Sequence, residues 1–270
     1  MSPGEAAGRL LLIGAGNMGG AMLRRWLDSG LDPAAVTVVS PSGRAMPAGV
    51  RVVAAVPGEA FDTVMLGFKP QGLAALRPAL AGLAPRLLVS ILAGVDVATL
   101  AGLSGAGAAV RAMPNLPVAI GKGVVALHGT AELDRAAALM APLGLVERIA
   151  DEALFDVVTA LAGSGPGFLY RWIDAQARAG AALGLPVDQA ARLALATVEG
   201  SALLAAGADV SPEVLADRVA SPGGSTREGL NVLDRDDALA ALVTATLRAA
   251  AARNAAMASA ARSSDPIRRS

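Results

Sequence analysis

A glycine-rich turn near the start of the chain restricts its possible folds more than any other feature. The apolar run from Leu10 to Ile13 has the length and composition of a buried strand. A G-x-G-x-x-G turn follows the run, Gly14-Ala15-Gly16-Asn17-Met18-Gly19, and a helical stretch follows the turn. In such a turn the first glycine permits the bend, the second lets the backbone approach a pyrophosphate, and the third lets the helix pack close to the strand. The sequence therefore predicts a dinucleotide-binding turn at the start of an α/β domain.

Short apolar runs alternate with helical stretches over residues 1–150. The runs are rich in leucine and β-branched residues and cover residues 10–13, 36–39, 63–66, 87–91 and 109–113. Runs that are apolar on both faces are typical of strands covered by helices on each side. Helical patterns at residues 20–29 and 71–81 lie between them. We therefore expect an α/β Rossmann domain with a parallel sheet over residues 1–150.

The character of the chain changes at residue 151. Strand-like runs stop, and alanine-rich helical patterns cover residues 153–162, 166–183, 187–206, 212–219 and 236–262. Gly184 ends one of these helices and Pro186 begins the next, since proline is favoured in the first helical turn. Ser211 before Pro212 is a typical N-cap. We therefore predict an all-α C-terminal domain over residues 151–270.

Composition excludes several classes of protein. Hydrophobic residues make up 54% of the chain and charged residues 17%, which is too apolar a mixture for a disordered chain. The 23 basic and 23 acidic residues cancel, which argues against a nucleic-acid partner. The chain has no cysteine and only one histidine, His128, so we expect no disulfide and no metal site. His128 follows a strand-like run and is expected at a sheet edge or a turn.

The mean hydropathy of +0.52 raises the question of a membrane. The longest weakly charged stretch, residues 87–110, is interrupted by Asp96 and by four glycines. A membrane-spanning helix needs about 20 mainly apolar residues. The first residues also lack the basic start and the apolar run of a signal peptide. We therefore expect a cytoplasmic protein without a membrane partner.

The end of the second predicted strand bears on the choice of cofactor. Sites that prefer NAD usually carry an aspartate or glutamate there, about 20 residues after the glycine turn, to bind the ribose hydroxyl. In this chain residues 38–44 contain no carboxylate but do contain Ser40, Ser42 and Arg44. Hydroxyl groups and a guanidinium can bind a 2′-phosphate. This pattern favours NADPH, with NADH as the alternative.

Five segments, the glycine turn included, bear on identity because they occur in one order across nearly the whole chain. The most specific is Val219-Ala220-Ser221-Pro222-Gly223-Gly224-Ser225-Thr226. The others are residues 12–19, Phe68-Lys69-Pro70-Gln71, Arg111-Ala112-Met113-Pro114-Asn115 and residues 162–166. Together, in this order and spacing, they resemble the pyrroline-5-carboxylate reductase family, whose members make proline from a cyclic imine.

The resemblance implies a small-molecule substrate and a Rossmann domain followed by a helical domain. It also implies that two chains form a homodimer through the helical domain, often within a ring of dimers. The resemblance also implies the site residues. In addition to Arg44, NADPH is bound by Ile13, Gly14, Ala15, Gly16, Asn17, Met18, Gly19, Ser40, Phe68, Lys69, Pro70, Ala93 and Asn115. The substrate is bound by Glu152, Ser221, Gly223, Gly224, Ser225 and Thr226.

The chemistry of imine reduction agrees with this assignment. Reduction of a C=N bond needs a hydride donor beside the carbon and a group that favours the protonated imine. The loop 221–226 opens a helix, and the free N–H groups of such a helix start can bind a carboxylate. The Thr226 hydroxyl can hydrogen-bond the ring nitrogen and is therefore the catalytic candidate. Taken alone, the loop is typical of a turn and an N-cap, Lys69 of a solvated residue and Glu152 of a first-turn acid.

Three other functions share parts of this sequence pattern. A hydroxyacid dehydrogenase of the 6-phosphogluconate type shares the two-domain plan but needs a lysine in its second domain, and the lysines here are Lys69 and Lys122. A reductase of a related cyclic imine, such as piperideine carboxylate, and an NADPH-binding regulatory protein without turnover stay open. One methylene in a pocket is worth only about 1–3 kcal/mol, so the residues do not separate the two imines. Leu116 also replaces a threonine that is common in the family.

Overall fold

A computed structural model describes residues 1–41, 43 and 45–263, and the chain forms two compact units. Among the described residues, the first unit contains 1–164 together with 250–263, and the second contains 165–249. An α/β unit and an all-α unit confirm the predicted fold class. The units divide after residue 164 and not at the predicted boundary of 150, because Phe155 is buried against the sheet beside Arg111 and His128.

The first unit is built on a sheet of eight strands in the order β3-β2-β1-β4-β5-β6-β7-β8. All neighbouring pairs are parallel except β6 and β7. Five of the strands confirm the predicted apolar runs, whereas the short edge strands β3 and β8 were not predicted. The strands are β1 (Leu10–Ile13), β2 (Val36–Val39), β3 (Arg51–Val53), β4 (Thr63–Leu66), β5 (Leu87–Ser90), β6 (Ala108–Pro114), β7 (Gly123–Gly129) and β8 (Gly144–Arg148).

The expected parallel sheet is wrong at β7, which runs antiparallel to β6. The two strands are joined by a short 3₁₀ helix, Leu116–Ile120, that ends at Gly121 in the left-handed conformation. A parallel pair needs a crossover of a dozen or more residues. The connection here is too short for that, so the chain must turn back on itself.

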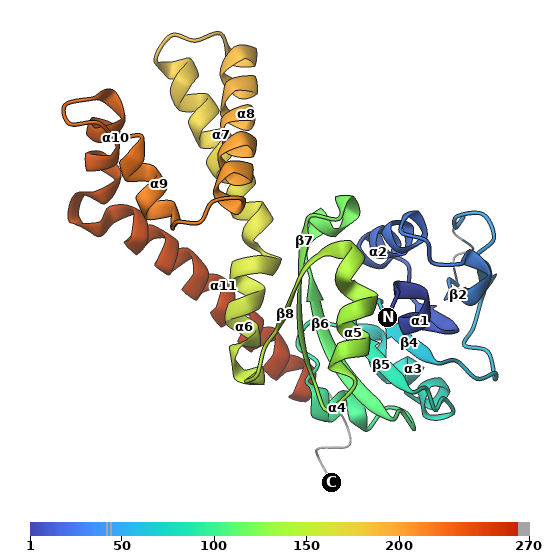
Figure 1. Cartoon of the computed structure of the whole chain (residues 1–270). Helices are drawn as coiled ribbons and strands as arrows, with labels where there is room; N and C mark the ends of the chain where they lie inside the picture. The colour runs from blue at the N-terminus through green and yellow to red at the C-terminus, as the bar shows by residue number, and fades with distance from the viewer. Residues whose placement is uncertain (42, 44, 264–270) are drawn as a thin grey trace. The chain divides into compact units, whose positions relative to one another are not determined.

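Helices cover both faces of the sheet, as the apolar strands require (Figure 1). Strand β1 shows the pattern, because Leu10 and Leu12 join one buried cluster and Leu11 and Ile13 join the other. Side chains of α1, α2 and α5 complete the first cluster, and those of α3 and α4 complete the second. These helices are α1 (Pro3–Ala7), α2 (Asn17–Asp28), α3 (Leu73–Ala81), α4 (Val97–Ala101) and α5 (Leu133–Met140).

After β8 the chain of the first unit becomes helical without leaving the sheet. A 3₁₀ turn (Glu152–Leu154) leads into α6 (Phe155–Val158) and then into a π-helical turn (Thr159–Gly163). The predicted helix over residues 153–162 is therefore present but irregular. A Cβ on Gly163 would lie 3.9 Å from the Met113 side chain, so the π-helical turn packs on β6.

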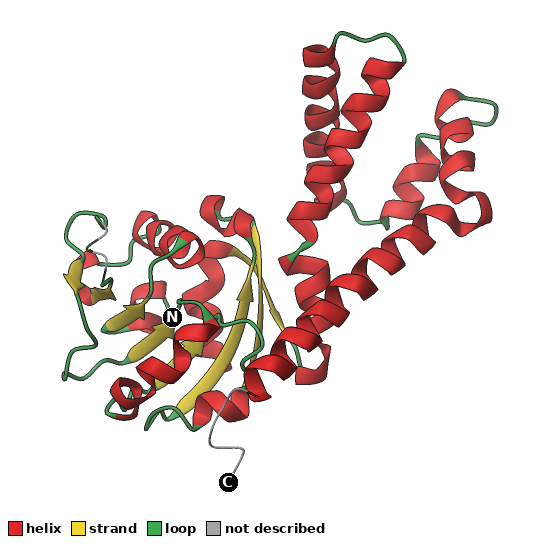
Figure 2. Ribbon diagram, turned by 180° about the vertical axis from the view of Figure 1, so that it is seen from behind, coloured by secondary structure: helices red, strands yellow, loops and turns green. Residues whose placement is uncertain are grey.

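The second unit consists of helices that follow the predicted boundaries closely (Figure 2). Helices α7 (Gly165–Ala182) and α8 (Val187–Ala206) form an antiparallel pair joined at Gly184, whose φ is +108°. They are followed by α9 (Pro212–Arg218), α10 (Ser225–Asp234), a 3₁₀ turn (Arg235–Asp237) and the long α11 (Ala238–Ser263). Ser211 caps α9 through its side chain, as predicted, by accepting from the Val214 N–H at 3.3 Å.

The end of α11 belongs to the first unit. A Cβ on Gly94, in the loop after β5, would lie 2.9 Å from the Ala258 Cα, and Ala258 is buried. The Asn254 side-chain amide donates to the Asp156 carbonyl oxygen at 3.2 Å. The first unit is therefore assembled from two separate stretches of the chain.

Candidate functional site

The glycine turn lies between β1 and α2 and has the conformation that its glycines predict. Gly14 has a φ of +92°, and a Cβ there would lie 2.8 Å from the backbone nitrogen of Phe68. A Cβ on Gly19 would lie 2.6 Å from the carbonyl oxygen of Gly14. Both positions therefore require glycine, the first for the bend and the second for the close packing of α2 on β1.

Gly16 differs from these two because a Cβ there would meet no protein atom within 4 Å. It is the exposed N-cap of α2 and supplies no side-chain hydrogen bond. The first helical bond runs from the Gly20 N–H to the Gly16 carbonyl at 2.8 Å. The N–H groups of residues 17–19 therefore have no acceptor within the helix. Open space beside free N–H groups at a helix start fits the pyrophosphate of a dinucleotide.

The predicted cofactor residues of the first unit follow neighbouring strands at one edge of the sheet. Gly14 follows β1, Ser40 follows β2, Phe68 follows β4, Ala93 follows β5 and Asn115 follows β6. The strand order reverses between β1 and β4, where Gly14 meets Phe68. In open parallel sheets ligands bind beyond the carboxyl ends of the strands at such a reversal. The fold thus brings these residues to one edge, while their individual roles stay predictions.

Main-chain bonds hold the end of β2 beside the glycine turn. The Gly14 N–H donates to the Val39 carbonyl at 3.2 Å, and the Ser40 N–H donates to the Val53 carbonyl at 2.9 Å. Ser40 is almost buried. Arg44 lies outside the described residues, so its contact with a 2′-phosphate stays a prediction.

The segment after β4 is held against the glycine turn in the same way. The Gly67 N–H donates to the Ile13 carbonyl at 2.8 Å. Phe68 packs against the second buried cluster, and Pro70 begins a 3₁₀ helix, Pro70–Gly72, whose N-cap is the exposed Lys69. The lysine therefore emerges at the carboxyl edge of the sheet, next to the turn that fits a pyrophosphate.

The side chain of Asn115 is engaged in the fold. Its Nδ2 donates to the Ala162 carbonyl at 3.0 Å, and its Oδ1 accepts from the Val124 N–H at 2.8 Å. The buried amide thus joins the end of β6 to β7 and to the π-helical turn. The adjacent Leu116 is 55% exposed. The cofactor contact of Asn115 stays a prediction, and these bonds give the residue a structural role as well.

Glu152 forms a cluster with Val97 and Arg111, which were not among the predicted site residues. Its Oε1 accepts from the Val97 N–H at 3.0 Å and from Arg111 Nη1 at 3.2 Å. The Arg111 guanidinium lies over the Phe155 ring, 4.3 Å from its centroid. An arginine within an otherwise apolar run is the sequence feature that could have indicated a role for Arg111. Its partner could not be found in the same way, because Glu152 is 41 residues away in the chain.

His128 is a structural residue. It lies within β7, which is paired on both sides, so the expected sheet edge or turn is wrong. Its Nδ1 is 2.7 Å from the Ile149 carbonyl oxygen, and its ring meets Phe155 edge-on with centroids 6.4 Å apart. In the part of the chain that the structure describes, no three His, Cys, Asp or Glu side chains gather where a metal ion would bind.

The predicted substrate loop lies in the second unit, at the start of α10. The Gly224 N–H donates to the Ser221 carbonyl at 2.9 Å, and Gly223 has a φ of +70°. Proline and then a positive-φ glycine at the centre of such a turn are the signature of type II. Gly224 is the N-cap of α10 and supplies no side-chain bond. The N–H groups of residues 225–227 therefore lack helical acceptors and, with the exposed Thr226 hydroxyl, can bind a carboxylate.

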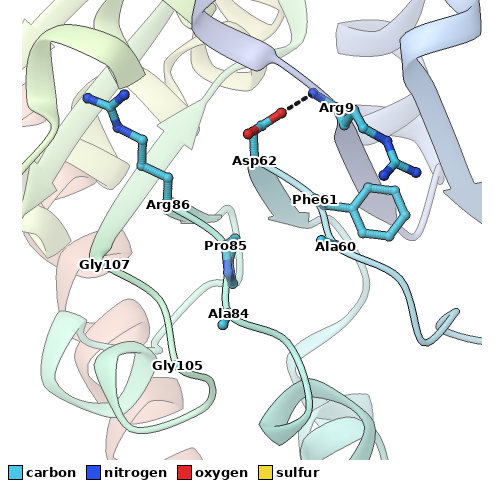
Figure 3. Close-up of a pocket in the computed structure, with 9 residues that line it drawn as sticks. All are labelled: Arg9, Ala60, Phe61, Asp62, Ala84, Pro85, Arg86, Gly105 and Gly107. Atoms are coloured by element: carbon cyan, nitrogen blue, oxygen red, sulfur yellow. Dashed lines mark hydrogen bonds between the residues drawn. The ribbon is translucent and has the colours of Figure 1, made fainter.

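A pocket of about 570 Å³ lies at the opposite edge of the sheet (Figure 3). Its residues precede β1, β4, β5 and β6 and include none of the predicted site residues. Within it the Arg9 N–H donates to Asp62 Oδ2 at 2.8 Å. The pocket is therefore separate from the glycine turn. It is lined by Arg9, Ala60, Phe61, Asp62, Ala84, Pro85, Arg86, Gly105 and Gly107.

Comparison with known proteins agrees with this geometry. A family model for NADP oxidoreductase, coenzyme F420-dependent, matches residues 9–94, and one for pyrroline-5-carboxylate reductase dimerisation matches residues 152–257. A pyrroline-5-carboxylate reductase of Pseudomonas aeruginosa is 35% identical over 265 residues, which cover 93% of this chain and 97% of the relative. The chain belongs to the pyrroline-5-carboxylate reductase family.

Other pyrroline-5-carboxylate reductases match over similar lengths. The Pisum sativum protein is 34% identical over 253 residues, which cover 88% of this chain and 92% of the relative. The solved structure of the Coxiella burnetii reductase has a TM-score of 0.82 at 28% identity and covers 92% of this chain and 97% of its own. A pyrroline carboxylate reductase of Plasmodium falciparum with NADP bound shares the fold, with a TM-score of 0.78 at 24% identity. The helical half of this chain is thus the dimerisation domain of the pyrroline-5-carboxylate reductase family.

Proposed function

We propose that this chain reduces 1-pyrroline-5-carboxylate to L-proline with NADPH. The observation that carries the proposal is the presence of two intact binding elements in one chain. The first unit has a dinucleotide turn with open space at Gly16. The second has a type II turn that opens α10 at Thr226. Family membership supports the same reaction, which is the last step in forming proline.

The first unit is proposed to bind the cofactor. The free N–H groups of residues 17–19 hold the pyrophosphate, and the absent side chain of Gly16 lets the backbone approach it. Ser40 and Arg44 favour a 2′-phosphate over a ribose hydroxyl, because residues 38–44 hold no carboxylate. NADH is the weaker alternative. When bound, NADPH supplies the hydride, and the proton on the ring nitrogen comes from water.

The second unit is proposed to bind the carboxylate of the substrate. The N–H groups of residues 225–227 offer three donors at the positive end of a ten-residue helix. Arg227 is engaged elsewhere, since its Nη2 donates to Asp217 Oδ1 at 2.6 Å and ties α10 to α9. The Thr226 hydroxyl is proposed to hydrogen-bond the ring nitrogen and favour the protonated imine. Most of the rate then comes from orientation of the reactants, because no strong protein acid is needed.

We also propose that the chain forms a homodimer, or a ring of dimers, through its C-terminal helices. Large apolar side chains are exposed along the helices of the second unit, more than an isolated soluble unit usually carries. They include Leu169, Tyr170, Trp172, Leu193, Leu195, Leu203, Leu204, Leu242 and Val243. Residues 152–182 are long and apolar enough, by length and composition alone, to cross a membrane. A dimer interface accounts for this apolarity, and we propose a cytoplasmic location with no membrane or nucleic-acid partner.

The test is the loss of absorbance at 340 nm with pyrroline-5-carboxylate, run in parallel with NADPH and NADH. We expect proline as the product and faster turnover with NADPH. Thr226→Ala should lower kcat by about 10- to 100-fold, the range for a hydrogen bond to a charged group, with NADPH binding retained. Thr130→Ala is the control, because Thr130 is exposed and bonds the Ala109 N–H at 3.3 Å in the first unit.

The same assay separates the alternatives. Faster turnover of piperideine carboxylate would assign the enzyme to the six-membered imine. NADPH binding without turnover of either imine would contradict the reductase proposal and favour a regulatory protein. Unchanged kcat in Thr226→Ala would remove the hydroxyl from the mechanism.

A further inference from the structure

Arg111 is a charged residue in the middle of a buried strand. The other residues of β6 are apolar, and Arg111 is only 6% exposed. In register it stands between Ser90 of β5 and His128 of β7. Burial of a guanidinium is costly unless its donors are paired. Its Nε is nevertheless buried with no partner among the described residues. Packing alone does not explain why a buried, incompletely paired arginine stands at this position, and its contact with Glu152 provides a functional explanation.

The guanidinium is held in place by aromatic and strand contacts. It lies over the Phe155 ring at 4.3 Å, and the His128 ring meets the same phenyl ring edge-on. His128 is in turn fixed by the Ile149 carbonyl oxygen, 2.7 Å from its Nδ1. The orientation of the Arg111 fork is therefore set by the sheet and by α6.

The Arg111 guanidinium and the Val97 N–H bind one oxygen of the Glu152 carboxylate, and the other oxygen is not bound by either group. Oε1 accepts both from Arg111 Nη1 at 3.2 Å and from the Val97 N–H at 3.0 Å. Oε2 has no partner among the described residues, and the side chain is 26% exposed. Val97 begins α4 at the end of the loop that carries Ala93, a predicted NADPH-binding residue. Glu152 Oε2 therefore lies at the same edge of the sheet as the glycine turn.

We propose that Arg111 is a positioning residue that presents Glu152 Oε2 to the ring nitrogen of the substrate. This inference rests on the proposed function, since it needs a cyclic imine as ligand. A carboxylate beside the ring nitrogen favours the protonated imine by its negative charge. The substrate class recognised by the first unit is therefore the cationic iminium, and Arg111 acts through Glu152 alone.

A double-mutant cycle tests the inference with Arg111→Met, Glu152→Gln and the two combined. Each single substitution should raise the KM for the imine about tenfold to a hundredfold, the range for a hydrogen bond to a charged group. The KM for NADPH and its Kd from fluorescence titration should stay within twofold of the wild-type values. Because Arg111 acts through Glu152, the combined variant should be no worse than Glu152→Gln alone. Arg86→Met is the matched control, since Arg86 pairs with Glu132 at 3.0 Å on the surface of the first unit.

Two further measurements keep the outcome decisive. Arg111→Lys retains the charge and should recover part of the imine KM, and thermal unfolding of every variant shows whether it folds. If Arg111→Met does not fold, Arg111→Lys and Glu152→Gln complete the comparison. Additive effects in the cycle, or a parallel rise in the KM for NADPH, would overturn the positioning role. A wild-type enzyme that reduces no cyclic imine would instead overturn the proposed function, and this inference with it.

Discussion

Replacing Gly16 and Gly19 by alanine, one at a time, should separate cofactor binding from folding within the glycine turn. A Cβ on Gly19 would lie 2.6 Å from the Gly14 carbonyl oxygen, whereas ordinary contacts of a Cβ lie at 3.4–4 Å. A Cβ on Gly16 would meet no protein atom within 4 Å. Gly19→Ala should therefore affect the stability of the protein, whereas Gly16→Ala should affect the binding of NADPH.

The magnitudes follow from these distances. Overpacking at Gly19 forces α2 away from β1 and should cost about 1–3 kcal/mol of unfolding free energy. In a chain of this size that is a fall in Tm of roughly 2–12 °C. Gly16→Ala changes only an N-cap, with a cost of about 1 kcal/mol or less. Its methyl group stands where the pyrophosphate must approach, so the Kd for NADPH should rise at least tenfold, or about 1.4 kcal/mol.

Thermal unfolding without cofactor and fluorescence titration with NADPH measure the two effects separately. Gly58→Ala is the matched control, because its Cβ would also meet no atom within 4 Å. The adjacent Glu59 bonds Arg9 and Arg51 where β1 and β3 begin, at the edge of the sheet opposite the glycine turn. Gly16→Ala with a wild-type Kd for NADPH would refute the assignment of the pyrophosphate to this turn. A wild-type Tm for Gly19→Ala would show that α2 can retreat without cost.

Other predictions address the cofactor, the core and the pH dependence. Ser40→Asp should weaken NADPH and strengthen NADH in paired titrations, because a carboxylate repels a 2′-phosphate and accepts from a ribose hydroxyl; equal changes for both cofactors would contradict this. Trp26→Phe removes the buried bond from Nε1 to the Leu139 carbonyl at 2.8 Å and should cost about 1–3 kcal/mol in urea unfolding. Hydrogen bonds from Arg51 and Arg9 lower the pKa of Glu59 below its ordinary 4.5, so its contribution to stability is present above pH 4.5 and is lost as the pH falls through the lowered value. Glu59→Gln should flatten the acid side of the stability profile, and an unchanged profile would assign that loss to other carboxylates.

The central strands were predictable because burial on both faces leaves a continuous apolar run. Leu10 to Ile13 point alternately into two clusters, and the sequence shows this as four apolar residues in a row. The edge strands β3 and β8 carry exposed residues such as Arg51 and Leu145, so no such run marks them. The direction of β7 depends on the short connection between β6 and β7, and the pattern of apolar runs does not show whether such a connection crosses over the sheet or turns back.

The candidate site was predictable to the extent that it is local in sequence. The glycine turn and the loop 221–226 are short segments whose backbone needs specify glycine, proline and hydroxyl residues. The pairing of Arg111 with Glu152 joins residues 41 positions apart and depends on the register of β6. The bonds of Asn115 to Ala162 and Val124 likewise arise only when β7 turns back beside β6.

The return of α11 to the first unit also has a consequence for synthesis. Gly94 is made early, but Ala258, which covers it, is among the later residues to be translated. At usual elongation rates the ribosome needs roughly 5–20 s to pass from residue 164 to residue 258. During that interval the nascent first unit lacks its last segment. The dimerisation helices are translated during the same interval, because they lie between the two stretches of the first unit in the sequence. Completion of the cofactor-binding half is therefore coupled to translation of the whole chain, and the two halves mature together.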